Sequence, residues 1–221
     1  MTPEQYASQA ASAHWERQLA GCEQMLVGKG VPAGIAALLC SPHFDEDRQL
    51  VVEARAWLKS GRRFLVLSGS SYRGKTVAAA SVFLHHTFEY EWFQTGLPVV
   101  TNRSWAYGRF VTCATYQGWH KAPFADTEAR EELSDARRTH LLVFDDLGTE
   151  LSDMRALFTD LVSYRTTAFT PQSKMYRASP LRTVITTNLD RAGVAEVYGD
   201  RVLNRLQGEG LIVALKARQA A

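Results

Sequence analysis

One eight-residue stretch restricts what this chain can fold into more than any other feature. It runs from Gly69 to Thr76 and reads Gly-Ser-Ser-Tyr-Arg-Gly-Lys-Thr. The apolar run Phe64 to Leu67 precedes it, and the helix-prone segment Val77 to Leu84 follows it. This order predicts a strand, a glycine loop and a helix. It fits the G-x-x-x-x-G-K-S/T phosphate loop, in which backbone N–H groups surround a triphosphate, the lysine balances its charge and the hydroxyl meets Mg²⁺.

The alternative for this stretch is a surface turn that happens to contain Gly-Lys-Thr. The strand before it and the helix after it are the context that a phosphate loop requires, and the N-terminus of that helix adds a favourable dipole for an anion. We therefore favour the phosphate loop. The residues expected to surround the phosphates are Gly69, Ser70, Ser71, Tyr72, Arg73, Gly74, Lys75 and Thr76.

A second apolar run ends in two carboxylates. Leu141 to Gly148 reads Leu-Leu-Val-Phe-Asp-Asp-Leu-Gly. A strand that is buried on both faces is a continuous apolar run, and open α/β sheets bind ligands at the carboxyl ends of their strands. In this Walker B pattern, Asp145 is expected to hold Mg²⁺ and Asp146 to orient and polarise the attacking water. An acidic turn is the alternative, and the upstream phosphate loop argues against it.

Two further segments suit catalysis of phosphoryl transfer. Thr183 to Asn188 is rich in β-branched residues, so it predicts a strand, and its terminal amide can hold the lytic water. A simple cap by this asparagine is the alternative. Asp200 to Gln207 predicts a short helix with Arg201 and Arg205 on one face. These arginines either pair with carboxylates of their own domain, or one reaches the phosphate held by a neighbouring subunit.

Composition sets the broad class of the protein. The chain has 221 residues, of which 46% are hydrophobic and 22% charged, so we expect one main globular domain. A formal charge of +2 does not by itself indicate a nucleic-acid binder. Cys22, Cys40 and Cys113 form no C-x-x-C pair, which favours reduced thiols in the cytoplasm over a zinc ribbon. Neither a secretory leader nor an apolar run long enough for a membrane span is present, so no membrane association is expected.

Two long segments lack acidic residues and invite a nucleic-acid interpretation. The first, Leu97 to Ala125, combines basic and aromatic residues, as platforms for single-stranded DNA do. Those residues are Arg103, Arg109, Lys121, Trp105, Tyr107, Phe110, Tyr116, Trp119 and Phe124. For the strand predicted at Phe110 to Ala114 we favour the alternative that its aromatic side chains pack in the core. The second segment, between Asp160 and Asp190, is either a DNA-contacting loop or a solvated insertion. It contains Arg165, Lys174, Arg177 and Arg182.

The remaining chain is assigned more simply. Helices are predicted over Asp47–Ser60, Val77–Phe88, Asp126–Arg138 and Leu151–Thr166, and a last strand over Leu211–Leu215. The proline-punctuated stretch from Gly30 to Asp45 is expected to be irregular. Residues 1–29 predict a helical arm, which either docks a partner or packs on its own domain, and residues 30–221 are expected to form the main domain. His85 and His86 are adjacent, so we do not expect them to share a metal.

The order of these motifs resembles that of the AAA+ ATPases of the DnaC/IstB group, which are bacterial and phage helicase loaders and their transposition-associated relatives. The resemblance covers roughly residues 30 to 215. Its motifs are Gly69–Thr76, Phe144–Glu150, Ile185–Leu189 and Gly199–Leu206. It implies an α/β P-loop fold with a parallel sheet flanked by helices, binding ATP and Mg²⁺. It also implies metal ligation by Thr76 and Asp145, and catalytic roles for Lys75, Asp146, Asn188 as sensor 1 and Arg205 as a finger acting in trans, with Arg201 as second choice.

The sequence departs from that family in three places. The loop interior Ser70 to Arg73 is bulkier than the glycine-rich interior usual there, so nucleotide affinity or turnover is altered, unless Tyr72 and Arg73 face outward. The chain stops at Ala221, soon after the last predicted strand, so we expect no full C-terminal lid and assign no sensor 2 arginine; Lys216 and Arg218 are weak substitutes. The arm before residue 30 is short and lacks the zinc-binding cysteines of some loaders.

By this resemblance, the expected protein is a cytoplasmic, ATP-dependent helicase loader. It would bind single-stranded DNA, assemble with itself into a ring or helical oligomer and deliver a replicative helicase. Its ATP hydrolysis would be weak alone and stimulated by DNA or the partner. One alternative is an IstB-like ATPase that marks duplex target DNA for a transposase. Another is a binding module that retains ATP with little turnover.

Overall fold

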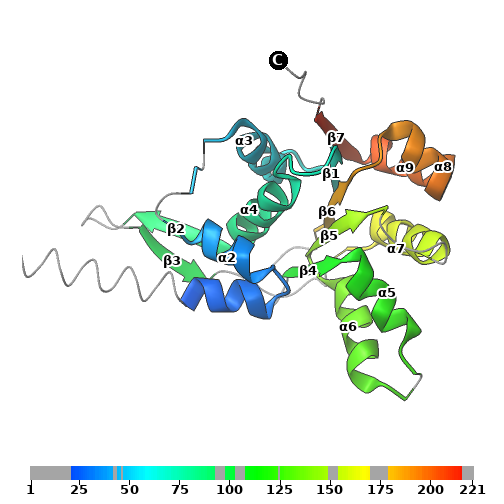
Figure 1. Ribbon diagram of the computed structural model, residues 1–221, viewed down its shortest axis with the longest axis horizontal. Helices are drawn as coiled ribbons and strands as arrows, with labels where there is room; N and C mark the ends of the chain where they lie inside the picture. The colour runs from blue at the N-terminus through cyan, green and yellow to red at the C-terminus, as the bar shows by residue number, and fades with distance from the viewer. Residues whose placement is uncertain are drawn as a thin grey trace, which may run out of the picture.

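A computed structural model describes residues 21–41, 44–45, 47–92, 98–102, 108–123, 125–148, 154–169 and 179–215, with the backbone alone for residues 87–92 and 98–102. Its centre is a sheet of five parallel strands in the order β4-β5-β6-β1-β7. These strands are β1 (Phe64–Gly69), β4 (Gly108–Thr112), β5 (Leu141–Leu147), β6 (Arg182–Thr187) and β7 (Gly210–Leu215). A separate antiparallel pair, β2 (Phe88–Trp92) with β3 (Pro98–Asn102), extends to one side (Figure 1).

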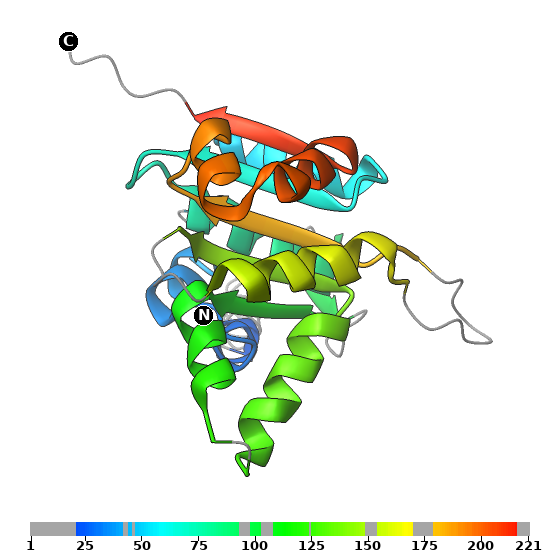
Figure 2. The same ribbon diagram turned by 90° about the vertical axis from the view of Figure 1, so that its right-hand side faces the viewer.

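Helices cover both faces of the sheet (Figures 1 and 2). They are α2 (Ala33–Leu39), α3 (Gln49–Ala56), α4 (Lys75–Thr87), α5 (Cys113–Lys121), α6 (Thr127–Arg138), α7 (Met154–Thr167), α8 (Arg191–Tyr198) and α9 (Asp200–Gly208). The 3₁₀ turn η1 (Trp57–Lys59) continues α3, and residues 21–28 are also helical. None of the described helices combines the length and apolarity of a membrane span. The predicted fold class, a P-loop-type α/β sheet between helices, is confirmed.

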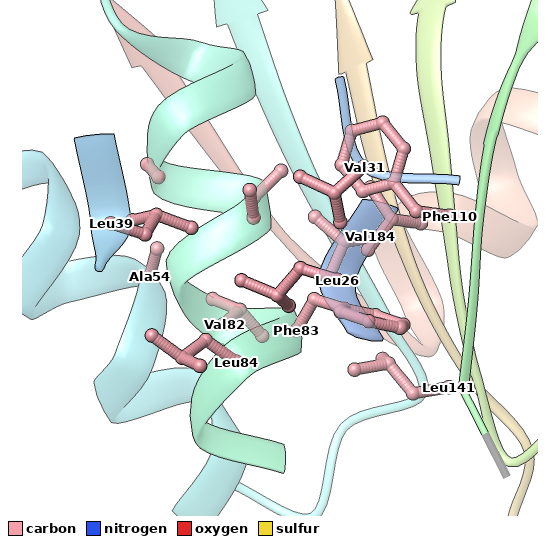
Figure 3. Packing of buried hydrophobic residues seen from close by; sticks show 14 of the residues in the cluster. Leu26, Val31, Leu39, Ala54, Val82, Phe83, Leu84, Phe110, Leu141 and Val184 are labelled. Carbon is pink, nitrogen blue, oxygen red and sulfur yellow. The ribbon is translucent and has the colours of Figure 1, made fainter. Parts of the chain in front are cut away.

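Alternate residues of the strands fill two separate cores. Leu65 and Leu67 of β1 pack in the cluster that contains α4, whereas Phe64 and Val66 pack in the cluster that contains α7. Successive side chains of a strand point to opposite faces, so one strand supplies both cores. Figure 3 shows the first cluster, in which Phe83 of α4 lies close to Leu26 and Phe110. Burial on both faces explains why these strands are continuous apolar runs in the sequence.

The predicted helices and strands are found within a few residues of their expected ends, and the clearest errors have local causes. The stretch after Gly30 is not irregular, because α2 begins directly after Pro32. Proline lacks an N–H to donate and fits the start of a helix. The strand predicted to reach Ala114 ends at Thr112, whose hydroxyl accepts from the N–H of Thr115 at 3.1 Å and caps α5. The β2–β3 pair, α5 and α8 were not predicted.

The helix over residues 21–28 packs on the domain. Leu26 is 1% exposed and belongs to the same cluster as the buried residues of α4. For this part of the chain, the geometry fits the alternative that the N-terminal helix packs on its own domain. Residues 1–20 lie outside the described part of the chain, and the division at residue 29 stays a prediction.

Candidate nucleotide-binding site

The loop from Gly69 to Thr76 joins β1 to α4 at the carboxyl edge of the sheet, as the motif predicts. Gly69 has φ 144° and Gly74 has φ 79°, both in the region that favours glycine. A Cβ on Gly69 would lie 2.7 Å from the backbone oxygen of Leu215, the residue that it faces in β7. The first glycine of the motif is therefore required by the close approach of β7 as well as by the turn.

Tyr72 holds a third left-handed position in this loop. Its φ is 60° and its side chain is fully exposed. The left-handed conformation costs a residue with a side chain roughly 1–2 kcal/mol. The outward orientation considered for Tyr72 is what the structure shows. Arg73 is half-buried, and its charge lies near enough to Lys75 to disfavour protonation of that lysine.

Lys75 is the first residue of α4, and its ammonium group is fully hydrogen-bonded. The side chain is 6% exposed, and Nζ donates to the carbonyl oxygens of Gly69 and Ser70 at 2.7 and 2.8 Å. The third bond goes to Oδ1 of Asn188 at 2.9 Å. An ammonium group has three donors, so all of them are used. Burial lowers the pKa of Lys75, and the charges of Asp146 and Asp145 oppose that shift.

Asp145 lies at the end of β5, directly against the phosphate loop. It is 3% exposed, and its Oδ1 accepts from the hydroxyl of Thr186 at 2.6 Å. The side chain of Thr76 hydrogen-bonds to the same carboxylate. Burial raises the pKa of Asp145, and the hydrogen bond from Thr186 opposes that shift. The negative charge of Asp146 raises this pKa further, whereas the hydrogen bond from Thr76 and the charge of Lys75 lower it. The residues predicted to bind Mg²⁺, Thr76 and Asp145, are thus in contact.

A β-bulge presents Asp146 beside Asp145. Phe144 pairs with Ile185 and Leu147 with Thr187, so β5 contains one more residue than β6 across this interval. At the bulge Asp146 has φ 60° and is exposed, and its N–H donates to the hydroxyl of Thr186 at 2.9 Å. In a regular strand two successive side chains point to opposite faces. The bulge breaks that alternation, and the charges of both aspartates act on Lys75.

Hydroxyl groups near the ends of adjacent strands hold Asn188 in place, and sequence reasoning missed them. Thr187 donates to the carbonyl of Leu147 at 2.6 Å and accepts from the N–H of Leu189 at 3.1 Å. Ser68 donates to the carbonyl of Leu189 at 2.6 Å. The residues on either side of Asn188 are therefore anchored to β5 and β1. The sequence clue was the presence of Ser68, Thr186 and Thr187 in otherwise apolar strands.

The side-chain oxygens of Thr76 and Asp145, close to Lys75, suit a hard cation that takes only some of its ligands from the protein. Mg²⁺ takes oxygen ligands and usually keeps several waters, with one or two carboxylates and substrate phosphates completing its shell. The hydroxyl of Thr76 and the carboxylate of Asp145 form such a partial set. Among the described residues, no group of three or more His, Cys, Asp or Glu side chains could hold a metal ion. A magnesium ion at this place would therefore need phosphate oxygens and water as further ligands.

The two candidate finger arginines lie away from this loop, on α9. The guanidinium of Arg205 donates to the hydroxyl of Ser163 on α7, and Arg201 is exposed. Neither has a hydrogen bond or ion pair to a phosphate-loop residue among those found in the described chain. A finger acts on the phosphate of a neighbouring copy, so both residues stay predictions.

Two arginines of the proposed DNA-contacting loop have structural roles, so the prediction is wrong for them. Arg165 is 0% exposed, and its guanidinium donates to Thr183 Oγ1 at 2.7 Å and to four backbone carbonyls. Arg182 lies over the ring of Trp57, 4.0 Å from its centroid, and donates to the carbonyls of Trp57 and Leu58. Burial of the charge explains why these arginines have so many partners. Lys174 and Arg177 lie outside the described residues.

The predicted aromatic platform is also largely part of the core where it is described. Phe110 and Tyr116 are 2% and 4% exposed, as the core alternative expected, and Arg109 is paired with Glu132 of α6. Arg103, Trp105, Tyr107 and Phe124 lie outside the described residues. His85 is hydrogen-bonded to Arg55 at 2.8 Å, and burial lowers the pKa of its neighbour His86 to about 4. Neither histidine belongs to a metal cluster among the described side chains.

Comparison with known proteins identifies the fold through structure alone. No protein-family model and no curated protein sequence matches the chain. A crystal structure of DnaI matches with a TM-score of 0.56 at 18% identity, over 85% of this chain and 95% of DnaI. AMPPCP-bound DnaA from Aquifex aeolicus matches with a TM-score of 0.50 at 16% identity, over 81% of this chain and 49% of DnaA. The replication initiator DnaA bound to AMPPCP and single-stranded DNA matches with a TM-score of 0.51 at 13% identity, over 76% of this chain and 45% of DnaA. The chain shares the AAA+ type of α/β fold with these proteins and spans about half of the DnaA chains.

Proposed function

We propose that this chain is a Mg²⁺-dependent ATPase that acts on DNA as a loader of a replicative helicase. The observation that carries the nucleotide part is the convergence of Lys75, Thr76, Asp145 and Asn188, which come from three different strand ends. The fold shared with DnaI and with AMPPCP-bound DnaA supports ATP as the ligand. The motif order supports the helicase-loader class.

Each residue of the site has a role that its environment suits. Lys75 would exchange a bond to protein oxygen for one to a β- or γ-phosphate oxygen. Thr76 and Asp145 would hold Mg²⁺, which supplies charge neutralisation on the phosphate oxygens. Asp146 is exposed, and its carboxylate would orient a water molecule and polarise its O–H bond. The amide of Asn188 would hold that water from the end of the neighbouring strand β6.

The proposed assembly completes the site between copies of the chain. Arg205, or Arg201 as second choice, would reach a phosphate bound by a neighbouring subunit of a ring or helical oligomer in the cytoplasm. The structure of DnaA with single-stranded DNA supports that type of nucleic acid as the ligand. Hydrolysis would then release the DNA and the helicase.

Substitution of Lys75 by alanine tests the nucleotide site. Lys75 makes charge-assisted hydrogen bonds, which contribute about 1.5–3 kcal/mol each, so Lys75→Ala should weaken ATP binding by about 10- to 100-fold. Binding is measured by titration with a fluorescent ATP analogue and Mg²⁺. Lys59→Ala, which changes an exposed lysine of η1, is the control and should bind normally. Unchanged binding by Lys75→Ala would refute the assignment of the loop.

The DNA and partner classes need a separate measurement. ATP hydrolysis is measured alone, with single-stranded DNA and with duplex DNA, each without a partner, with a replicative helicase or with a transposase. Stimulation by single strands and helicase supports the loader. Preference for duplex DNA and a transposase would favour the IstB-like alternative, and tight ATP binding without turnover in every mixture would favour the binding module.

A further inference from the structure

The helix over residues 21–28 and α2 form a hairpin, and the turn between them is held against β4 at the edge of the sheet. At its turn, the N–H of Gly30 donates to the carbonyl of Val27 at 2.9 Å, and that of Val31 to the carbonyl of Leu26 at 3.0 Å. This is a Schellman closure, which needs a left-handed residue, and Gly30 has φ 97°. A Cβ on Gly30 would lie 2.0 Å from the backbone oxygen of Phe110, so β4 also fixes the turn.

The open end of this hairpin carries two cysteines. Cys22 precedes the end of its helix by six residues, and Cys40 follows the first residue of α2 by seven. At about 1.5 Å per residue, Cys22 and Cys40 lie about 9 and about 10.5 Å along their helices from the ends that face the turn. The two helices run in opposite directions, so the cysteines come level. The thiols of Cys22 and Cys40 are indeed hydrogen-bonded to each other.

The two thiols are buried, free and chemically unequal. Cys22 is 4% exposed and Cys40 is 7% exposed, and both belong to the cluster that backs α4. The hydrogen bond from Cys22 lowers the pKa of Cys40, and the same bond together with burial raises the pKa of Cys22. They therefore titrate as a pair in which Cys40 is the better thiolate.

We propose that Cys22 and Cys40 are a redox pair that a hydroperoxide converts to an intramolecular disulfide. In the first step, the thiolate of Cys40 attacks one oxygen of hydrogen peroxide and the O–O bond breaks, giving Cys40 sulfenic acid and hydroxide. In the second, the sulfur of Cys22 displaces hydroxide from the Cys40 sulfur as its S–S bond forms. The hydroxide ions take up the two thiol protons. The balance is two thiols and one peroxide to one disulfide and two waters.

The disulfide between Cys22 and Cys40 would link the two helices of the hairpin that packs behind the nucleotide site. Covalent closure between residues 22 and 40 restricts the unfolded chain, which favours the folded state. The hairpin packs on α4 through α2, and α4 begins with Lys75. This inference does not depend on the proposed function, because the thiols lie outside the phosphate loop.

The test uses the full-length chain, reduced, freed of reductant and exposed to hydrogen peroxide at one to ten equivalents. Free thiols are counted by alkylation after denaturation, and linked peptides are mapped by mass spectrometry without reductant. The expected result is a fall from three alkylatable thiols to one, the loss of two hydrogens in mass and a peptide pair joined through Cys22 and Cys40. A higher melting temperature should accompany oxidation, and dithiothreitol should reverse all of these changes.

Single variants separate the two steps. Cys113→Ser changes a buried cysteine of the other core and should leave disulfide formation intact. Cys22→Ser should stop at Cys40 sulfenic acid, which dimedone traps, whereas Cys40→Ser should react at least tenfold more slowly. Wild-type protein that keeps three thiols, forms disulfides only between chains or over-oxidises at either cysteine would overturn the proposal, and this result needs no variant.

Discussion

The ammonium group of Lys75 donates a 2.9 Å hydrogen bond to Oδ1 of Asn188, so the phosphate-loop helix is joined directly to the end of β6. The two residues are 113 positions apart in the sequence. Because Lys75 has two further bonds within its own loop, it stays anchored if this one is lost. The contact therefore allows binding and turnover to be separated by substitution.

We expect Asn188→Ala to reduce the rate of ATP hydrolysis by about 10- to 100-fold, because it removes the amide that we propose holds the attacking water. ATP affinity should change by less than about fivefold, since one hydrogen bond contributes only about 0.5–1.5 kcal/mol. Steady-state hydrolysis and equilibrium titration measure the two effects. If Asn188→Ala instead weakened ATP binding as much as Lys75→Ala does, Asn188 would contribute to binding ATP and not specifically to its hydrolysis.

Asp145→Asn should stabilise the protein while abolishing hydrolysis. Burial raises the pKa of Asp145, so the ionised carboxylate that is present at neutral pH opposes folding. The amide oxygen of asparagine can still accept from Thr186, and we expect a gain of about 0.5–2 kcal/mol in the free energy of unfolding. Urea unfolding at pH 7 measures it. The exposed Asp146 provides the control, since Asp146→Asn should also lose activity but change stability by less than about 0.5 kcal/mol.

Tyr72→Gly should be more stable than Tyr72→Ala by about 0.5–1 kcal/mol. Both changes remove the exposed ring, but only glycine removes the cost of the left-handed backbone at φ 60°, and its greater freedom in the unfolded chain offsets part of that gain. Thermal and urea unfolding of the two variants give the difference directly. Equal stability would mean that the backbone at residue 72 relaxes without strain.

Arg165→Met should lower the free energy of unfolding by about 2–4 kcal/mol. The change leaves the hydroxyl of Thr183 and the carbonyls of Ala136 and Arg182 without the donor that now satisfies them. Arg155→Met, at an exposed position of the same helix, is the matched control and should have little effect. If Arg165 instead contacted DNA, its replacement would weaken DNA binding and leave stability unchanged.

Acid should destabilise the protein partly through His86. Burial, with smaller contributions from Arg182 and His140, lowers the pKa of His86 from 6.5 to about 4. The unfolded chain therefore binds the proton more readily, so this stability is present above pH 6.5 and is lost as the pH falls through about 4. The loss is up to about 3 kcal/mol. His86→Leu should flatten the fall in stability between pH 6.5 and 4, and unchanged acid sensitivity would contradict the burial of this imidazole.

The sequence was sufficient for the parts of the site that lie on regular elements. Asp145 follows a doubly buried strand and Lys75 begins a helix, and both patterns are local. The bulge at Asp146 could not be predicted, because it depends on how β5 pairs with β6. Nor could the burial of Arg165, because a basic residue in an acid-free segment resembles a DNA contact until its carbonyl partners are placed around it. Both the bulge at Asp146 and the burial of Arg165 depend on contacts between segments that are distant in the sequence, and local sequence patterns do not reveal such contacts.

The central position of β6 sets a limit on when the site can exist during synthesis. β6 lies between β1 and β5 and pairs with both, although it follows them in the chain. As a nascent chain leaves the ribosome, the phosphate loop and the aspartates emerge well before the strand that brings them together. Under the proposed function, ATP would be bound only after residues 182–188 have joined the sheet, so it would not assist the earlier steps of co-translational folding.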